Sequence, residues 1–498
     1  MSEKTAYDKL VDWFDVKFGF AKTPLKPIPD FAMNPIYWLG LLLALTFGMQ
    51  AATGMFMLLY YVPTSAQAYS STASIISSVP LGSLVETLHL YGAYAMIILT
   101  FLHLVRNYFG SAHKGDRDLM WLVGIVLGVI VVSFGVTGYL LPWTVISKSA
   151  SDVAIGFLNF FPTGIANLGK FVAVGSGSDD SEIISFLHIH TVFLPLALIA
   201  FLGLKIYMYE VHGPAYVPAY GKPKSDKIHP WFPKVFLYAV MLFSVYIAIL
   251  LAVASLFPLV LPPAYSAATA GTITVQPDWY LLWLYQLLKI QIFEGPAAAY
   301  VLAAVIAFGV LLFLMPFYDR RKRRTLSQRP VYAAIGSILI VELITLTIWG
   351  YLTPGRIIPN YEAVLVLFGL AAVTAAAVLS VYRFRGKMKA ANPQASSIMP
   401  TQPTPDSRVQ KVSPQRKEHF VKNVKNAGES MLNKFTAVFV VFLAVASVSL
   451  ASAVNMLPDI LANAPFIVVA LAVFVVSSFF MCIMLRKFVL AYEAVAKR

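Results

Sequence analysis

Apolar runs of about 20 residues recur along this chain and restrict its fold more than any other feature, because each can cross a membrane as an α-helix. The approximate bounds of the ten runs are 36–61, 85–109, 119–141, 187–210, 235–257, 298–317, 331–352, 362–382, 435–456 and 464–485. Of the 498 residues, 58% are hydrophobic and only 12% are charged, whereas soluble proteins carry about 25% charged residues. We therefore predict an all-α fold, a polytopic transmembrane helical bundle of about ten spans.

The positive charge of the chain lies almost entirely on one side of the predicted membrane. Alternate loops on the other side hold only four of the 38 Lys and Arg residues. Because basic loops stay in the cytoplasm, we expect both termini to be cytoplasmic and the chain to lie in the plasma membrane. The net charge of +14 then indicates contact with anionic lipid headgroups and not with nucleic acid.

Ionisable residues inside predicted spans mark functional sites, and this chain has only one cysteine, Cys482, to offer as a thiolate ligand. In the second span, His89 and His103 share one helix face and lie about 21 Å apart along the axis. In the fourth span, His190 is followed fifteen residues later by Lys205, again nearly on one face. Both spans run in the same direction, so His89 lies at the same membrane depth as His190, and His103 lies at the same depth as Lys205. Two stacked ligand pairs indicate two planar metal cofactors between helices, although any one histidine alone could be a hydrogen-bonded core residue.

Glycines repeat the same interval on two other spans. Gly40 and Gly54 lie fourteen residues apart in the first span, and Gly124 and Gly138 lie fourteen apart in the third. Glycine also allows close packing of membrane helices, so either pair alone is ambiguous. Their match to the histidine interval favours flat cofactor faces lying against bare backbone at two depths.

Five motifs give the chain a family resemblance. They are Gln50–Thr53–Gly54, His89–Gly92–His103–Arg106, FGVTGYLLPW at 134–143, His190–Leu194–Pro195 and PDWY at 277–280. On these motifs the chain resembles cytochrome b of the quinol-oxidising bc and bf complexes, in a single-chain prokaryotic form, over about residues 8–385. Position 38 is Trp, where the bf type carries a cysteine for an additional haem.

The resemblance implies a function as the haem-carrying membrane subunit of a proton-translocating quinol oxidoreductase. Quinol would be oxidised near the outer surface, with one electron passing to a Rieske iron–sulfur protein. The other electron would cross the membrane through two haems, b-type or modified a-type, to a quinone near the inner surface. The resemblance also implies a dimer and a downstream electron carrier or terminal oxidase.

The resemblance also assigns site residues. Asp278 is the candidate proton acceptor from quinol, since a carboxylate can take a hydroxyl proton, and Tyr280 would position it. The remaining candidates shape the quinol site (Pro277, Trp279, Pro142, Trp143), pair with a haem propionate (Arg106) or lie at the inner quinone site (His212, Lys234).

His89 and His190 are implied as the ligands of the outer haem, and His103 as a ligand of the inner haem. Lys205 stands where the family has its fourth histidine. Lysine binds iron only as a neutral amine, whose formation metal binding favours. The alternative is an inner haem held by His103 alone, with the Lys205 amine extending to a propionate or to the membrane surface.

These patterns divide the chain into five parts. Residues 1–35 form a cytoplasmic surface segment with an amphipathic stretch, and residues 36–211 form a dihaem four-helix bundle. Residues 212–385 hold the PDWY quinol site and four spans. Residues 386–433 form a basic, proline-rich cytoplasmic linker, and residues 434–498 add two further spans.

Two other functions use some of the same features. A dihaem cytochrome b anchor that links a peripheral dehydrogenase to the quinone pool has stacked histidines but needs no PDWY motif. A transporter with histidines as a proton relay predicts internal repeats or broken helices, which the sequence does not show.

Overall fold

The computed structural model describes residues 11–12, 27–216, 227–266, 268–269, 275–320 and 328–391. The chain divides into two compact units, of which the larger comprises Leu25–Ile228 and Leu259–Gly386. The two strands are β1 (Ile28–Pro29) and β2 (Ile228–His229). The α-helices are α2 (Leu39–Leu58), α3 (Ala68–Ser78), α4 (Gly82–Phe109), α5 (Asp118–Leu140), α6 (Val145–Leu158), α7 (Thr163–Val174), α8 (Asp179–His188), α9 (Leu194–His212), α10 (Phe236–Leu256), α11 (Leu282–Leu288), α12 (Ala298–Phe313), α13 (Met315–Tyr318), α14 (Pro330–Leu352) and α15 (Asn360–Ala391).

Short 3-10 and π-helical turns complete the described secondary structure. The π-helical turns are η4 (Ile189–Phe193) and η6 (Trp231–Val235). The 3-10 turns are η2 (Asp30–Met33), η3 (Pro35–Tyr37), η7 (Trp279–Leu281), η8 (Gln291–Phe293) and η9 (Gly295–Ala297).

Eight helical stretches in the described residues are long and apolar enough to cross a membrane. They coincide with the first eight predicted spans and confirm the all-helical transmembrane fold. The last two predicted spans and nearly all of the N-terminal amphipathic segment lie outside the described residues. Helix α15 continues to Ala391, past residue 386, where the predicted linker begins. This extension contains two lysines, a methionine and two alanines, which have good intrinsic helix propensity.

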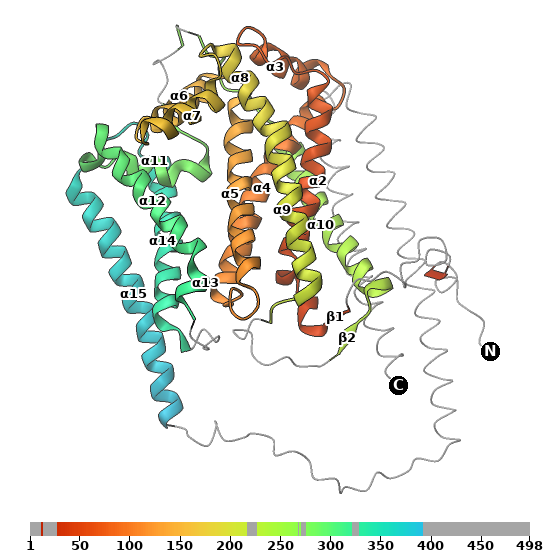
Figure 1. The fold of residues 1–498 in the computed structure, drawn as a ribbon, viewed down its shortest axis with the longest axis vertical. Coiled ribbons are helices and arrows are strands. Elements are labelled where there is room, and N and C mark those ends of the chain that lie inside the picture. The colour runs from red at the N-terminus through yellow and green to blue at the C-terminus, as the bar shows by residue number, and fades with distance from the viewer. Residues whose placement is uncertain are drawn as a thin grey trace, which may run out of the picture. The chain divides into compact units, whose positions relative to one another are not determined.

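Helices α2, α4, α5 and α9 form a bundle in the larger unit (Figure 1). Helix α2 packs along α4, α5 packs along α9, and α4 contacts α5. Four buried residues form the centre of its apolar core: Met96, Ile130, Val131 and Leu198. Met96 lies seven residues from both His89 and His103, so this core separates the two predicted cofactor depths.

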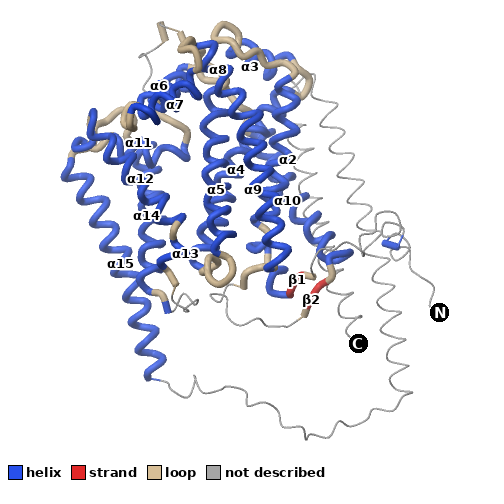
Figure 2. The backbone as a smooth tube through the Cα atoms, viewed as in Figure 1, coloured by secondary structure: helices blue, strands red, loops and turns tan. Residues whose placement is uncertain are grey.

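Other helices of the larger unit pack beside and across this bundle. Helix α14 packs along α11 and contacts α4, while α12 contacts α5. The short helices α3, α6, α7 and α8 gather at one end of the bundle, the upper end in Figure 2. In the smaller unit, η6 leads into the apolar span α10.

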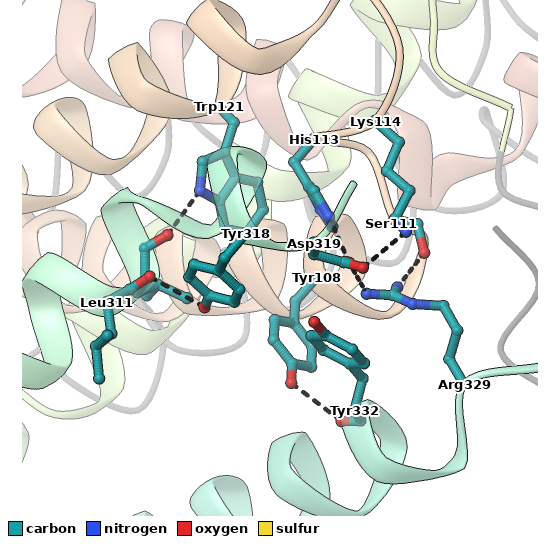
Figure 3. A network of polar contacts seen from close by, with 11 residues as sticks. Tyr108, Ser111, His113, Lys114, Trp121, Leu311, Tyr318, Asp319, Arg329 and Tyr332 are labelled. Carbon is teal, nitrogen blue, oxygen red and sulfur yellow. Dashed lines mark hydrogen bonds and ion pairs between the residues drawn. The ribbon is translucent and has the colours of Figure 1, made fainter. Parts of the chain in front are cut away.

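A buried polar cluster joins the turn after α4 to the segment between α13 and α14 (Figure 3). The carboxylate of Asp319 accepts hydrogen bonds from His113 and Lys114, each at 2.9 Å, and from Arg329. Arg329 also donates to the Ser111 hydroxyl. Burial lowers the pKa of His113 to about 4, so the ring is neutral at pH 7 and donates through Nε2–H.

The residues of this Asp319 cluster come from two segments of the chain that lie more than 200 positions apart. Their contacts connect the two segments that make up the larger unit. Removing one partner of such a buried ion pair costs about 3–5 kcal/mol. The His113 ring also packs on Trp121, with ring centroids 5.3 Å apart. Trp121 donates a 2.8 Å hydrogen bond to the carbonyl of Leu312. The cluster therefore anchors the first turn of α5 against α12.

Candidate functional site

The imidazole rings of His89 on α4 and His190 on η4 face each other inside the bundle. Their centroids lie 6.3 Å apart, with 61° between the ring planes. Two imidazoles that bind one metal ion from opposite sides, each about 2 Å from it, have ring centres about 6 Å apart. The structure thus brings this predicted ligand pair to the separation that a shared iron requires.

A glycine, which has no side chain, lies next to each of these rings. A Cβ atom added to Gly54 would lie 3.3 Å from Cε1 of His89, and one added to Gly138 would lie 2.7 Å from Cε1 of His190. Side chains at these two positions would therefore crowd the rings. We call His89, His190, Gly54 and Gly138 the first ligand level.

A local change in helix geometry accompanies His190. The span Asp179–His212 is continuous, but Pro195 has no backbone N–H to donate within it. The helix widens just before the proline, where the Leu194 N–H donates to the carbonyl of Ile189, five residues earlier. Such π-helical turns inside α-helices are frequent at functional sites. His188, on the same helix, is exposed.

The second ligand level contains His103, Gly40, Gly124 and Lys205. A Cβ atom on Gly40 would lie 3.5 Å from Cε1 of His103, and one on Gly124 would lie 2.8 Å from Nζ of Lys205. The Lys205 amine stays inside the bundle and donates a hydrogen bond to the Met120 carbonyl on α5. Each predicted glycine thus lies against one predicted ligand.

The residues at both levels fit the haems that the family resemblance implies. At each level, two glycines open the backbone beside the nitrogen side chains, and an apolar core separates the levels. The Arg106 guanidinium lies 4.2 Å from the centre of the Tyr37 ring and donates to Asn107 at 3.1 Å. This places a positive charge one turn beyond His103.

The PDWY segment packs against the bundle next to the first ligand level. Asp278 Oδ1 accepts a 2.9 Å hydrogen bond from the Tyr94 hydroxyl on α4. The Trp279 ring contacts the Tyr94 ring edge-on at 5.9 Å. A Cβ atom on Gly135 would lie 3.2 Å from the Tyr280 hydroxyl, so glycine admits this tyrosine against α5. Pro277 precedes the contact and lies outside any helix or strand.

Burial shapes the chemistry of this segment. It raises the pKa of Asp278, although the hydrogen bond from Tyr94 opposes the rise. It also raises the pKa of Tyr280, as does the neighbouring Asp278 carboxylate. The buried Tyr280 hydroxyl has no hydrogen-bond partner among the described residues. The segment therefore pairs a basic carboxylate with a phenol that can bind a ligand.

Trp143 and Pro142 lie at the end of α5. Trp143 has a positive φ of 53° and is 3% exposed. Its ring contacts Tyr265 at 6.3 Å, and its carbonyl accepts from the Tyr265 N–H at 3.2 Å. Pro142 is partly buried beside it. Trp143 therefore links the end of α5 to the chain that leads toward PDWY.

The two residues predicted for the inner quinone site belong to different units of the chain. His212 is exposed at the end of α9, and its backbone carbonyl accepts from Arg117 at 2.8 Å. Lys234 belongs to the smaller unit, where its amine lies 2.9 Å from Nδ1 of His229. These two residues stay a prediction.

Three contacts of the site were not foreseen from sequence: those of Tyr94, Thr53 and Thr137. Tyr94 carried no assigned role, although a tyrosine hydroxyl in an apolar span must find a polar partner. Thr53 and Thr137 lie 2.8 Å and 3.0 Å from Nδ1 of His89 and His190. The signal for the threonines was the Thr–Gly pair that occurs in both the first and the third span.

Comparisons with known proteins identify the family of the chain. The family model for cytochrome b/b6/petB matches residues 26–213, and that for the cytochrome b C-terminal/b6/petD region matches residues 263–381. Cytochrome b of Sulfolobus acidocaldarius is 33% identical over an alignment of 379 residues, and the match covers 70% of this chain and 66% of that protein. A cytochrome bc complex cytochrome b subunit of Chlorobaculum thiosulfatiphilum is 28% identical and covers 68% of this chain and 79% of its own.

A solved structure of a hyperthermophilic respiratory Complex III contains a similar chain. The match has a TM-score of 0.60 and 25% sequence identity, and it covers 75% of this chain and 96% of the other. The two family models together cover more than half of the residues. The chain therefore belongs to the cytochrome b family, whose members are haem-containing membrane subunits of bc-type oxidoreductase complexes.

Proposed function

We propose that this cytochrome b holds two haems, at the first and second ligand levels, and oxidises quinol beside the PDWY segment. One electron goes to a Rieske iron–sulfur partner, and the other crosses the membrane to a quinone at the opposite surface. When bound, the haems supply one-electron redox chemistry. The facing pair of His89 and His190, each backed by a glycine, is the observation that carries this proposal.

The position of Asp278 supports quinol oxidation next to the first ligand level. Its partner Tyr94 lies five residues, or about 7.5 Å, along α4 from His89. Tyr280 reaches Gly135, three residues and about 4.5 Å from Gly138 on α5. Both contacts are farther from His103 and Lys205. Quinol at PDWY is thus close to the first haem and remote from the second.

Three side chains divide the work on quinol. Asp278 accepts a hydroxyl proton, because burial raises the pKa of its carboxyl group and makes the anion more basic. The Tyr94 hydroxyl holds that carboxylate in place. The Tyr280 hydroxyl hydrogen-bonds the bound quinol. Trp279, Pro277, Trp143 and Pro142 limit the space around it.

The remaining assignments follow the same proposal. The loops on the PDWY side carry few Lys and Arg residues, so we assign that side to the outer surface. Both termini are then cytoplasmic, and the complex lies in the plasma membrane. Arg106 pairs with a propionate of the second haem. His212 and Lys234 stay the candidates for the second quinone site, and the complex is a dimer with a downstream carrier. The anchor alternative is less favoured, because it needs no C-terminal cytochrome b region.

Quinol-driven reduction of the haems in Asp278→Asn tests this proposal. Removing a positioned general base slows proton transfer by about 10²–10⁴-fold, so quinol oxidation should slow by that order while both haems stay bound and dithionite-reducible. The control is Asp278→Glu, which keeps the carboxylate. Unchanged turnover in Asp278→Asn removes Asp278 from the proton path.

The pH dependence provides a second readout. Asp278 accepts a proton only when it is ionised, so turnover should fall as the pH drops through its raised pKa. In Asp278→Asn this fall of turnover at acid pH should disappear, and the remaining slow turnover should not depend on pH in that range. An acid limb of the same midpoint in both proteins would assign the titration to another group.

A further inference from the structure

The imidazoles of the first ligand level each contact a threonine hydroxyl on a neighbouring helix. Thr53 Oγ1 on α2 lies 2.8 Å from Nδ1 of His89. Thr137 Oγ1 on α5 lies 3.0 Å from Nδ1 of His190. Both threonines are buried, at 9% and 7% exposed. The two contacts use the same ring nitrogen and leave Nε2 of each ring for a metal.

The hydrogen-bond partners of the threonines decide which atom donates. A threonine hydroxyl has one proton to give. Thr53 gives it to the carbonyl of Met49 at 2.9 Å, and Thr137 gives it to that of Ser133 at 2.8 Å. Toward the histidines each hydroxyl can therefore only accept. The proton on each ring lies on Nδ1, and Nε2 carries the free lone pair that iron needs.

From this geometry we propose that Thr53 and Thr137 are positioning residues that select the metal-binding tautomer of His89 and His190 and lower the redox potential of the first haem. The inference rests on the proposed haem sites. An Nδ1–H that donates to an acceptor makes the opposite ring nitrogen more basic. A more basic ligand favours oxidised iron over reduced iron, which lowers the potential.

The chain builds this arrangement twice from one dipeptide. Thr53–Gly54 and Thr137–Gly138 each place a hydroxyl and a bare Cα on adjacent residues. The glycine admits the ring, and the threonine one position earlier reaches its Nδ1. Helix α2 serves the histidine of α4, and α5 serves the histidine on the α9 side.

The second ligand level lacks the arrangement. Its glycines follow Leu39 and Val123, which carry no hydroxyl. Nδ1 of His103 is buried and has no hydrogen-bond partner among the residues that the structure describes. The same chain therefore contains an internal reference in which the ligand ring has no such acceptor.

Threonine-to-valine variants of the purified complex test the inference, since valine keeps the shape and removes the hydroxyl. In Thr53→Val and Thr137→Val we expect two haems per chain and a higher midpoint potential for the first haem alone. Each tenfold loss of preference for oxidised iron corresponds to about 59 mV for one electron. The g-values of the first haem in electron paramagnetic resonance should change with it.

Serine and a distant threonine provide the controls. Thr53→Ser and Thr137→Ser keep the hydroxyl and should restore the native potential. Thr100→Val removes a buried hydroxyl that has no hydrogen-bond partner among the described residues, and it should leave the first haem unchanged.

The outcomes separate this inference from the proposed function. Fewer than two haems in the native protein contradicts the haem sites themselves. Two haems with an unchanged first potential in both valine variants overturns the role of the threonines. Loss of the first haem in valine but not serine variants supports that role, whereas equal effects of valine and serine assign it to packing.

Discussion

The two ligand levels share a sequence interval but differ in chemistry. The first has two facing imidazoles, each with its Nδ1 held by a threonine. The second has His103, with no partner for its Nδ1 in the described structure, and the Lys205 amine bonded to the Met120 carbonyl. Intervals of fourteen residues on α4 and fifteen on the α9 side thus set the depth of each ligand, while the neighbouring helices set its hydrogen-bond partner. The two haems that we propose would therefore differ in their ligands, although their levels are nearly equally spaced on both helices.

The largest expected effect is the loss of one haem. His89→Ala removes a ligand from the first level and leaves the second untouched, because the buried core around Met96 separates them. We expect haem analysis to fall from two haems per chain to one, with the second haem spectrum retained. A mutant with two haems of native spectrum would break the pairing of His89 with His190.

The next effect is a change of spin state without loss of haem. Lys205→Ala should convert a six-coordinate low-spin second haem into a five-coordinate high-spin one, as absorption and electron paramagnetic resonance spectra would show. Lys205→His supplies an imidazole instead and should return the low-spin form. An unaltered low-spin spectrum in Lys205→Ala would mean that the amine does not ligate iron.

Alanine in place of two of the glycines compares a tight position at the first level with a looser one at the second. A methyl group at Gly138 would lie 2.7 Å from the His190 ring, whereas one at Gly40 would lie 3.5 Å from the His103 ring. Overpacking of this kind costs about 1–3 kcal/mol. Haem occupancy should therefore fall more at the first level in Gly138→Ala than at the second level in Gly40→Ala. The reverse order would show that these distances do not control occupancy.

The smallest expected effect on the haems comes from the Asp319 cluster. Asp319→Asn leaves Lys114 and Arg329 buried without their counter-charge, which costs several kcal/mol of stability. The melting temperature should fall while both haem spectra stay native, since no cluster residue belongs to either level. A shifted spectrum of the second haem would show that this cluster affects Lys205 through the first turn of α5.

The sequence predicted those features that are determined within a single helix. Apolar length predicted the spans, and the helical repeat predicted that His89 and His103 share a face. Thr137, Tyr94 and Asp319 required knowledge of which helices touch. Asp319 meets His113 across 206 positions in the chain, and Tyr94 meets Asp278 across 184. No local pattern contains such a contact, since packing between helices decides it.

Haem extraction together with electron paramagnetic resonance of the oxidised native complex tests the central claim most directly. Two non-covalent haems per chain, with two low-spin signals of equal intensity and different g-values, are the result expected for a first level of two imidazoles and a second level of imidazole and amine. A single haem per chain, or a protein that purifies without haem, would contradict the two-level account.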